Sequence, residues 1–542
     1  MAQGETPNGS PFIEEVERRQ VRYQKLVQFT ASSTRAAAVM LVAAICALIV
    51  ANGSLYEHFQ AFWHTEVGFA MGDSVAEMSL SHIINDIFMA IFFLLVGLEI
   101  KYEMTVGELT NIRQAFLPIF AAIGGVAVPI AIYVAFNASN PATAHGWGVP
   151  TATDIAFALG IMTLLGKRVP NGVRVFLTTL AVADDIIAII VIAVFYGHNP
   201  SVFWLVAVVL VMVVLIALNR SHVYSLVPYL ILGVILWYCV FMSGIHATFA
   251  GVLLAFTIPS GSRVNLKSFL TWSGEKVKTA TEIFNPDEHV MVQQDYIRTV
   301  KSLSRVARQV VPPATRLEHA LYPWVNFGVL PLFALTNADV RFVGGSLGGV
   351  WADSALYGVF FGLLFGKPLG IMLFSFIVTK LKIASLPDRT TWTHMLGAGI
   401  LGGVGFTMAI FVANLAFSDP AIVVTAKLGI LSASAIAGVL GFMFLYIQAK
   451  REERQGVDYG AEPGSEPGPE LGPVPEPVPV PIRAPEPEPV PAPMPGPTSE
   501  SPESYGLPPE SRGPAPVPMP GPVPESPESP RDASQENPVV RQ

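Results

Sequence analysis

Long apolar runs recur along most of this 542-residue chain, and they constrain its fold more than any other feature. A helix needs about 20 mostly apolar residues to cross a bilayer, and lipid offers its backbone no outside hydrogen-bond partner. The sequence therefore predicts an all-α polytopic membrane protein with about 12 transmembrane helices. Polar breaks place the spans at 36–52, 80–100, 115–136, 142–166, 173–196, 202–218, 224–242, 245–259, 319–338, 355–379, 396–417 and 421–447.

Composition divides the chain into parts with different physical properties. Only 14% of the residues are charged, against roughly 25% in soluble domains. Residues 451–542 hold 27 of the 45 prolines, with 16 acidic and 6 basic residues. Such a segment favours extended polyproline geometry and cannot bury a core. We therefore expect a cytoplasmic N-terminal segment at 1–34, a membrane domain at 35–450 and a disordered tail at 451–542. The alternative is that the tail holds a docking motif for a partner.

The distribution of Lys and Arg predicts the orientation. Cytoplasmic loops are enriched in these residues, and they fall in alternate loops here, with Arg341 as the one exception on the outer side. Both termini are therefore expected in the cytoplasm. The longest inner loop, 260–316, contains apolar and basic residues at helical spacing over 296–311. This pattern fits a basic helix at the membrane interface or, equally, a solvated linker helix.

A few ionisable residues lie inside the predicted spans, where each costs about 2.5–3.5 kcal/mol. Asp154, Asp184, Asp185 and Lys367 fall near the middle of their spans, and Asp86 lies in the second. Successive helix positions point about 100° apart, so Asp184 and Asp185 are expected to have different roles. A buried lysine needs a carboxylate partner, and one of the two is the natural candidate for Lys367. The alternative is an ion pair that only holds helices together.

Two spans contain residues that interrupt a helix. Pro150 and a Thr-rich run precede Asp154, and glycines are dense over 399–408. Interrupted spans expose backbone groups at mid-membrane, where inverted-repeat transporters bind small ions. Glycines in membrane helices also serve close packing, so the second break is the weaker signal.

The chemistry of these groups predicts ion exchange. A carboxylate at mid-membrane can hold either a proton or a small hard cation such as Na⁺ or Li⁺. If both compete for Asp185 or Asp184, the site exchanges them across the bilayer. No Gly-x-x-x-x-Gly-Lys-[Ser/Thr] run is present, so an ion gradient is the expected driving force. We expect no cofactor, no enzymatic activity and no nucleic-acid partner; the expected partners are the transported ions and the lipid bilayer.

Several runs carry a specific resemblance. They are FFLLVGLEIK (92–101), TDIAFALG (153–160), the pair at 184–185, SGIHAT (243–248), RLEH (316–319), GKPLG (366–370) and GFTM (405–408). In this order they resemble the NhaA family of bacterial Na⁺/H⁺ antiporters. The resemblance implies two interrupted, crossing helices in an inverted repeat, and electrogenic, pH-regulated exchange in the bacterial inner membrane for sodium and pH homeostasis.

By position, Asp185 resembles the family's principal ion- and proton-binding carboxylate, and Asp184 the neighbour that pairs with the lysine at Lys367. Thr153 and Asp154 resemble the polar pair at the helix crossing. Further matches carry the family's other roles. Glu99, His246, Glu318 and His319 match positions implicated in pH sensing, and Asp86 matches an aspartate of the second span.

The chain also departs from the family pattern. Tyr102, Thr315 and Tyr322 stand where Arg, Lys and His are expected, so the network of residues that responds to pH is altered. The segment 53–79, free of Lys and Arg, could form an outer hairpin that pairs two protomers. A Na⁺-coupled organic-anion symporter and a membrane scaffold acting through its Pro-rich tail are the alternative functions.

Overall fold

The computed structural model describes residues 29–30, 32–71, 74–107, 110, 112–197, 200–262, 264–341 and 353–455. All of them belong to the first of two units into which the chain divides, Met1–Glu476. The predicted disordered tail beyond residue 455 and most of the predicted N-terminal segment 1–34 lie outside the described residues.

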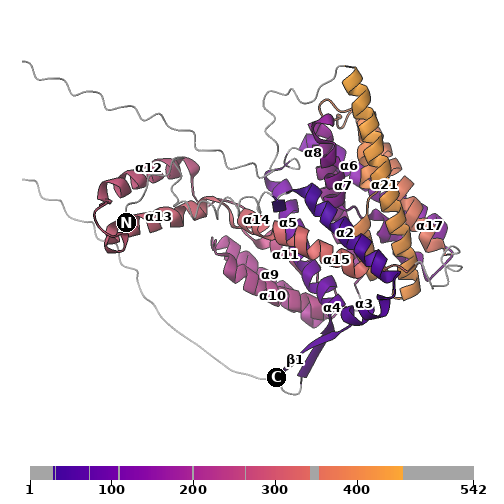
Figure 1. Cartoon of the computed structure of the whole chain (residues 1–542), viewed down its shortest axis with the longest axis horizontal. Coiled ribbons are helices and arrows are strands. Elements are labelled where there is room, and N and C mark those ends of the chain that lie inside the picture. Colours follow the sequence, from indigo (N-terminus) through magenta and orange to yellow (C-terminus); the bar gives the residue numbers. More distant parts are fainter. Residues whose placement is uncertain are drawn as a thin grey trace, which may run out of the picture. The chain divides into compact units, whose positions relative to one another are not determined.

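Helices make up most of the described chain, as predicted (Figure 1). The α-helices are α2 (Ser33–Ala51), α3 (Tyr56–Trp63), α4 (Leu80–His82), α5 (Met89–Thr105), α6 (Ile112–Asn137), α7 (Ile155–Leu164), α8 (Asn171–Phe195), α9 (Val202–Arg220), α10 (Leu226–Met242), α11 (Phe249–Thr257), α12 (Leu266–Ile283), α13 (Gln294–Val310), α14 (Pro313–Trp324), α15 (Leu330–Asn337), α17 (Ser354–Phe361), α18 (Lys367–Lys380), α19 (Trp392–Gly402), α20 (Phe406–Ala416) and α21 (Pro420–Arg454). Short π-helical segments, whose turns are wider than those of an α-helix, are η1 (Ile83–Phe88), η6 (Val325–Val329) and η7 (Gly362–Gly366). Short 3₁₀ segments are η3 (Ala144–Thr151), η4 (Gly166–Arg168) and η5 (Val290–Val292).

Each predicted span coincides with a helix or with consecutive helices. Among the described residues, 8 helices are long and apolar enough to cross a membrane, and the bent pair of α19 and α20 makes up to 9. The other three predicted spans fall on α10, on α11 and on the run from α14 to α15, which are shorter individually. The multi-span helical fold is therefore confirmed, and the full count of twelve stays a prediction.

The segment 53–79, for which the sequence predicts a hairpin on the outer side, does contain a hairpin; the side of the membrane stays a prediction. Strands β1 (Glu66–Met71) and β2 (Ser74–Ser79) pair antiparallel, from Glu66 opposite Ser79 to Met71 opposite Ser74. Its role in pairing two protomers stays a prediction.

Both predicted interruptions are present and lie side by side. The chain is extended at Ala152 and Asp154, between η3 and α7. It breaks again between α19 and α20, which are bent by 46°. The amide of Asp154 donates to the carbonyl oxygen of Val404 at 2.7 Å, so each break supplies a backbone partner to the other.

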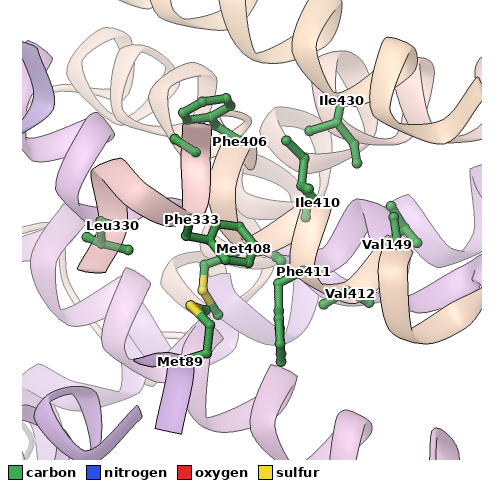
Figure 2. Close-up of a cluster of buried hydrophobic side chains, with 14 of the residues drawn as sticks. Met89, Val149, Leu330, Phe333, Phe406, Met408, Ile410, Phe411, Val412 and Ile430 are labelled. Carbon is green, nitrogen blue, oxygen red and sulfur yellow. The ribbon is translucent and has the colours of Figure 1, made fainter. Parts of the chain in front are cut away.

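A cluster of apolar side chains packs around these breaks (Figure 2). The rings of Phe93 and Phe333 lie 5.4 and 6.3 Å from the ring of Phe411 on α20, between centroids. Met89 and Met408 belong to the same buried cluster. Burial of such side chains is the main favourable contribution to the packing of these helices against one another.

Helices α6 and α18 approach each other at backbone distance. A β-carbon added at Gly370 would overlap the carbonyl of Gly124, and one added at Gly124 would overlap the carbonyl of Gly370. Small residues permit such close crossings in membranes. This contact fixes the start of α18, and therefore fixes Lys367.

Candidate functional site

Asp184 and Asp185 lie at the middle of α8 and are both buried, with 2% of each residue exposed. Because they are consecutive on a helix, their side chains leave it in different directions. The structure accordingly places them in different surroundings. Asp184 forms an ion pair, and Asp185 faces a cavity.

The ion pair joins α8 to the first residue of α18. Lys367 Nζ lies 2.5 Å from Oδ2 of Asp184 and 2.5 Å from the carbonyl oxygen of Thr151, and it also donates to Oγ1 of Thr153. Lys367 is only 1% exposed. The contact expected from the sequence is thus present, and the hydrogen bonds offset part of the cost of burying two charges.

Lys367 directly follows the π-type segment η7. Such widened turns shift the register of backbone hydrogen bonds and often occur at functional sites. The turn and the contact between α6 and α18 together direct the lysine toward the first interrupted span.

Asp154 links the two interrupted spans. Its Oδ1 accepts a hydrogen bond from the amide of Phe157 at 3.0 Å, which caps the N-terminus of α7. Its Oδ2 accepts from the amide of Thr407 at 3.1 Å and from the Thr407 hydroxyl at 2.5 Å, at the first turn of α20. One carboxylate therefore offsets the positive ends of two helix dipoles.

Thr153 connects the ion pair to the second break. Its hydroxyl lies 2.5 Å from Oδ2 of Asp184 and 3.1 Å from the carbonyl oxygen of Gly402. Thr153 and Asp154 both line the cavity that Asp185 faces. The predicted polar pair thus lies between the buried ion pair and an accessible space.

This cavity has a volume of about 230 Å³ and is strongly acidic. Of the described residues that line it, none is Lys or Arg. A low-dielectric cleft that carries charges of one sign concentrates ions of the opposite sign, so this cavity attracts cations. The carboxylates in its wall are Glu99, Glu103, Asp154, Asp185 and Glu318.

Asp185 is the cavity carboxylate with an unsatisfied oxygen. Its Oδ1 is buried and has no hydrogen-bond partner among the residues that the structure describes. An isolated buried carboxylate is costly unless it gains a proton, a hydrogen bond or a cation. The geometry therefore makes Asp185 the group that can accept a proton or a small cation from the cavity.

One wall of the cavity belongs to the apolar cluster around the breaks. Leu330 and Met408 line the cavity and are also members of that cluster, and Figure 2 draws both of them with Phe333 and Phe411. An ion that reaches Asp185 thus meets packed apolar side chains on this side.

The residues predicted to sense pH do not all share this cavity. Glu99 and Glu318 line it, as do the family departures Tyr102 and Tyr322.

Two histidines and one aspartate lie elsewhere. His246 Nε2 is 2.8 Å from the carbonyl oxygen of Tyr196, His319 is exposed on α14, and Asp86 lies in η1. None of the three is among the described lining residues.

Two residues of the site were not predicted from the sequence. Glu103 follows Glu99 by four positions on α5, and this spacing places both on one helix face. Thr407 follows Gly405, the last glycine of the second break, by two positions. Its position near the start of a half-helix was the available signal.

Comparisons with known proteins agree over most of the chain. A family model described as Na⁺/H⁺ antiporter 1 matches residues 27–445. The antiporter NhaA of Wolinella succinogenes is 42% identical over 430 residues, 79% of this chain and 94% of the relative. NhaA of Helicobacter pylori is 44% identical over 428 residues (79% and 96%), and NhaA of Acidithiobacillus ferrooxidans 42% over 431 (78% and 98%). The family match spans every residue of the site.

Proposed function

We infer that the acidic cavity serves transport, because the chain belongs to the NhaA family of Na⁺/H⁺ antiporters and exchanges sodium ions for protons across a membrane. It is a secondary transporter and not an enzyme. The organic-anion symporter is not favoured, since the described cavity wall contains no Lys or Arg to bind an organic anion.

Asp185 is the proposed exchange site. The observation that carries this assignment is its unpartnered buried oxygen in a cavity lined by carboxylates. A Na⁺ or Li⁺ ion would bind there, with oxygens of Asp154 and Thr153 at hand in the same wall. A proton on Asp185 would displace the ion, so the two substrates compete for one group.

The Asp184–Lys367 pair is the proposed second proton site. Both partners are buried and share Thr153 with the cavity wall. An ion at Asp185 would change the balance of charge around Lys367 and release a second proton. This provides more than one proton per sodium ion, as electrogenic exchange requires.

Regulation by pH is proposed for Glu99, His246, Glu318 and His319. Partial burial raises the pKa of Glu318, which precedes the predicted span 319–338. Glu318 therefore loses its proton at a higher pH than an ordinary glutamate, and the cavity wall becomes more negative as pH rises. This direction of change supports greater cation uptake at alkaline pH.

The cellular setting is part of the same proposal. We place the protein in the bacterial inner membrane with both termini in the cytoplasm, where Glu99 and Glu318 would sample the cell interior. The strands β1 and β2 are the proposed contact between two protomers. Exchange of internal Na⁺ or Li⁺ for external protons would serve sodium and pH homeostasis.

Asp185→Asn tests the exchange site. We expect it to abolish the Na⁺-dependent change in ΔpH in reconstituted vesicles, because an amide neither binds the proton nor carries the charge. Asp419→Asn is the matched control, since Asp419 caps α21 and Asn caps helices equally well. Exchange with normal apparent Na⁺ affinity in Asp185→Asn would contradict the assignment.

A further inference from the structure

Helices α12 and α13 form a hairpin within the long loop 260–316. The two helices pack against each other (Figure 1), and the rings of Phe284 and Tyr296 lie 5.1 Å apart near the turn. At its base, the amide of Ala314 donates to the carbonyl oxygen of Pro259 at 3.2 Å. The chain thus leaves α11 and enters α14 at one point, which tethers the hairpin next to two predicted spans.

One side of α12 presents apolar side chains that no other part of the described chain covers. Leu266, Leu270 and Val277 recur at helical spacing and are 59%, 62% and 51% exposed. At the turn, Met291 and Val292 are 75% and 68% exposed. We call Leu266, Leu270 and Val277 the apolar stripe. A solvated linker helix would carry polar side chains at such positions.

Basic side chains follow one side of α13. Arg298, Lys301, Arg305 and Arg308 recur every three or four residues and are all exposed. The helix has a single acidic residue, Asp295, which lies 3.4 Å from Arg298. Residues at this spacing share one helix face, so α13 presents a positive row.

We propose that the α12–α13 hairpin binds the membrane surface, with the apolar stripe at the acyl boundary and the basic row against anionic phospholipid headgroups. Amphipathic helices that combine these two features bind in the interface plane, and their affinity depends on anionic lipid. The long stems of Lys and Arg let the charged ends reach the headgroups while the apolar residues lie deeper.

An environment-sensitive fluorophore on the full chain tests this proposal. In a background with Cys46 and Cys239 replaced by Ser, the label is attached at Leu270→Cys or, as the position control, at Glu275→Cys on the opposite side of α12. The protein is reconstituted in phosphatidylcholine vesicles with and without phosphatidylglycerol. We expect the emission at position 270 to shift to shorter wavelength with the anionic lipid, and the emission at 275 to stay the same.

Charge removal gives a matched second control. Glutamine at positions 298, 301, 305 and 308 should abolish the lipid-dependent shift at 270. Glutamine at the tail arginines 483, 512, 531 and 541 removes the same charge and should leave the shift intact. Monodisperse elution of every variant establishes that loss of the shift is not loss of the fold.

Two results would overturn the proposal. One is a water-like emission at position 270 in both vesicles. The other is a shift that ignores lipid charge and grows with the protein-to-lipid ratio, which would assign the stripe to a second copy of the chain. Neither readout depends on the transport reaction, so failure of the exchange proposal would not affect it.

Discussion

At the scale of single residues, adjacent positions on one helix carry different chemistry. Oδ2 of Asp184 is bonded to Lys367 and Thr153, whereas Asp185 lines the cavity. Oδ1 of each aspartate has no partner in the described structure, and only that of Asp185 belongs to a cavity-lining residue. The difference follows from the helical twist, which turns one carboxylate toward α18 and the other toward the open space.

Lys367→Ala should destabilise the protein, because it leaves Asp184 buried without its cation. Removing one partner of a buried pair costs about 3–5 kcal/mol, whereas replacing both partners by apolar residues is often nearly neutral. We expect a lower melting temperature in detergent for Lys367→Ala. The double variant Asp184→Leu/Lys367→Met should recover much of the loss. Equal melting temperatures of wild type and Lys367→Ala would show that the pair contributes nothing to stability.

Thr407→Val should weaken the link between the two breaks. The change removes the hydroxyl that bonds to Asp154 and keeps the side-chain volume, so a buried charge loses one of its hydrogen bonds. Hydrogen bonds to charged groups contribute about 1.5–3 kcal/mol, and we expect thermal unfolding to shift downward accordingly. Thr407→Ser keeps the hydroxyl and serves as the control. If Thr407→Ser has the same lowered melting temperature as Thr407→Val, loss of the hydroxyl is not the cause of the destabilisation.

The sequence singled out the charged residues within the predicted spans, and it missed Glu103 and Thr407 of the cavity wall. Asp154, Asp184, Asp185 and Lys367 stand out because a charge inside an apolar run is costly. Thr407 does not stand out, since threonine is uncharged and common in membrane helices, where its hydroxyl bonds to another helix or to its own backbone. Its pairing with Asp154 depends on two segments that are 253 positions apart meeting in space.

At the scale of helices, the interruptions were predictable and the widened turns were not. Proline and glycine mark the two breaks directly in the sequence. The π-type segments η1, η6 and η7 have no comparable residue signature, because a shift in hydrogen-bond register is decided by what packs around the helix. The position of η7 directly before Lys367 is therefore known only from the structure.

Gly370→Ala should separate α6 from α18, since its β-carbon would overlap the backbone of Gly124. Overpacking of this kind typically costs about 1–3 kcal/mol, and displacement of α18 would also move Lys367. We expect lower thermal stability and reduced exchange. Gly399→Ala is the matched control, because its β-carbon would meet Pro368 at an ordinary 3.5 Å. If both variants behave like wild type, the backbone contact is not required.

At the scale of the whole molecule, the family match and the last described helix end within ten residues of each other. The family match stops at residue 445 and α21 ends at Arg454. A chain truncated after Gln455 should keep Na⁺/H⁺ exchange with unchanged apparent Na⁺ affinity, since no residue of the site is removed. Loss of exchange on this truncation would favour the alternative in which the protein acts through its tail.

Truncation after Phe444 provides the contrast. It removes the buried Leu445, Ala449 and Glu452, and with Glu452 the 3.1 Å contact to His394 Nε2 on α19. We expect this shorter chain to fail to fold, as judged by yield and elution profile. The pair of truncations separates the end of the fold from the end of the chain.

The predicted architecture was correct where hydropathy decides it. Spans and their order follow from apolar length alone, and α13 was expected from its spacing. Helix α12 was not predicted, because its apolar residues are too few for a span. The geometry of the site could not be predicted from the sequence, because it depends on which residues distant in the chain come together.

The hydrogen bonds between the two breaks have a consequence for biosynthesis. A half-helix such as α7, with 10 residues, is far too short to cross a bilayer. The amide of Asp154 and its carboxylate find their partners at Val404 and Thr407. Because Thr407 lies 253 positions after Asp154, the first broken span is synthesised long before the second. Until the second break is inserted, the amide and the carboxylate of Asp154 need other hydrogen-bond partners, such as water.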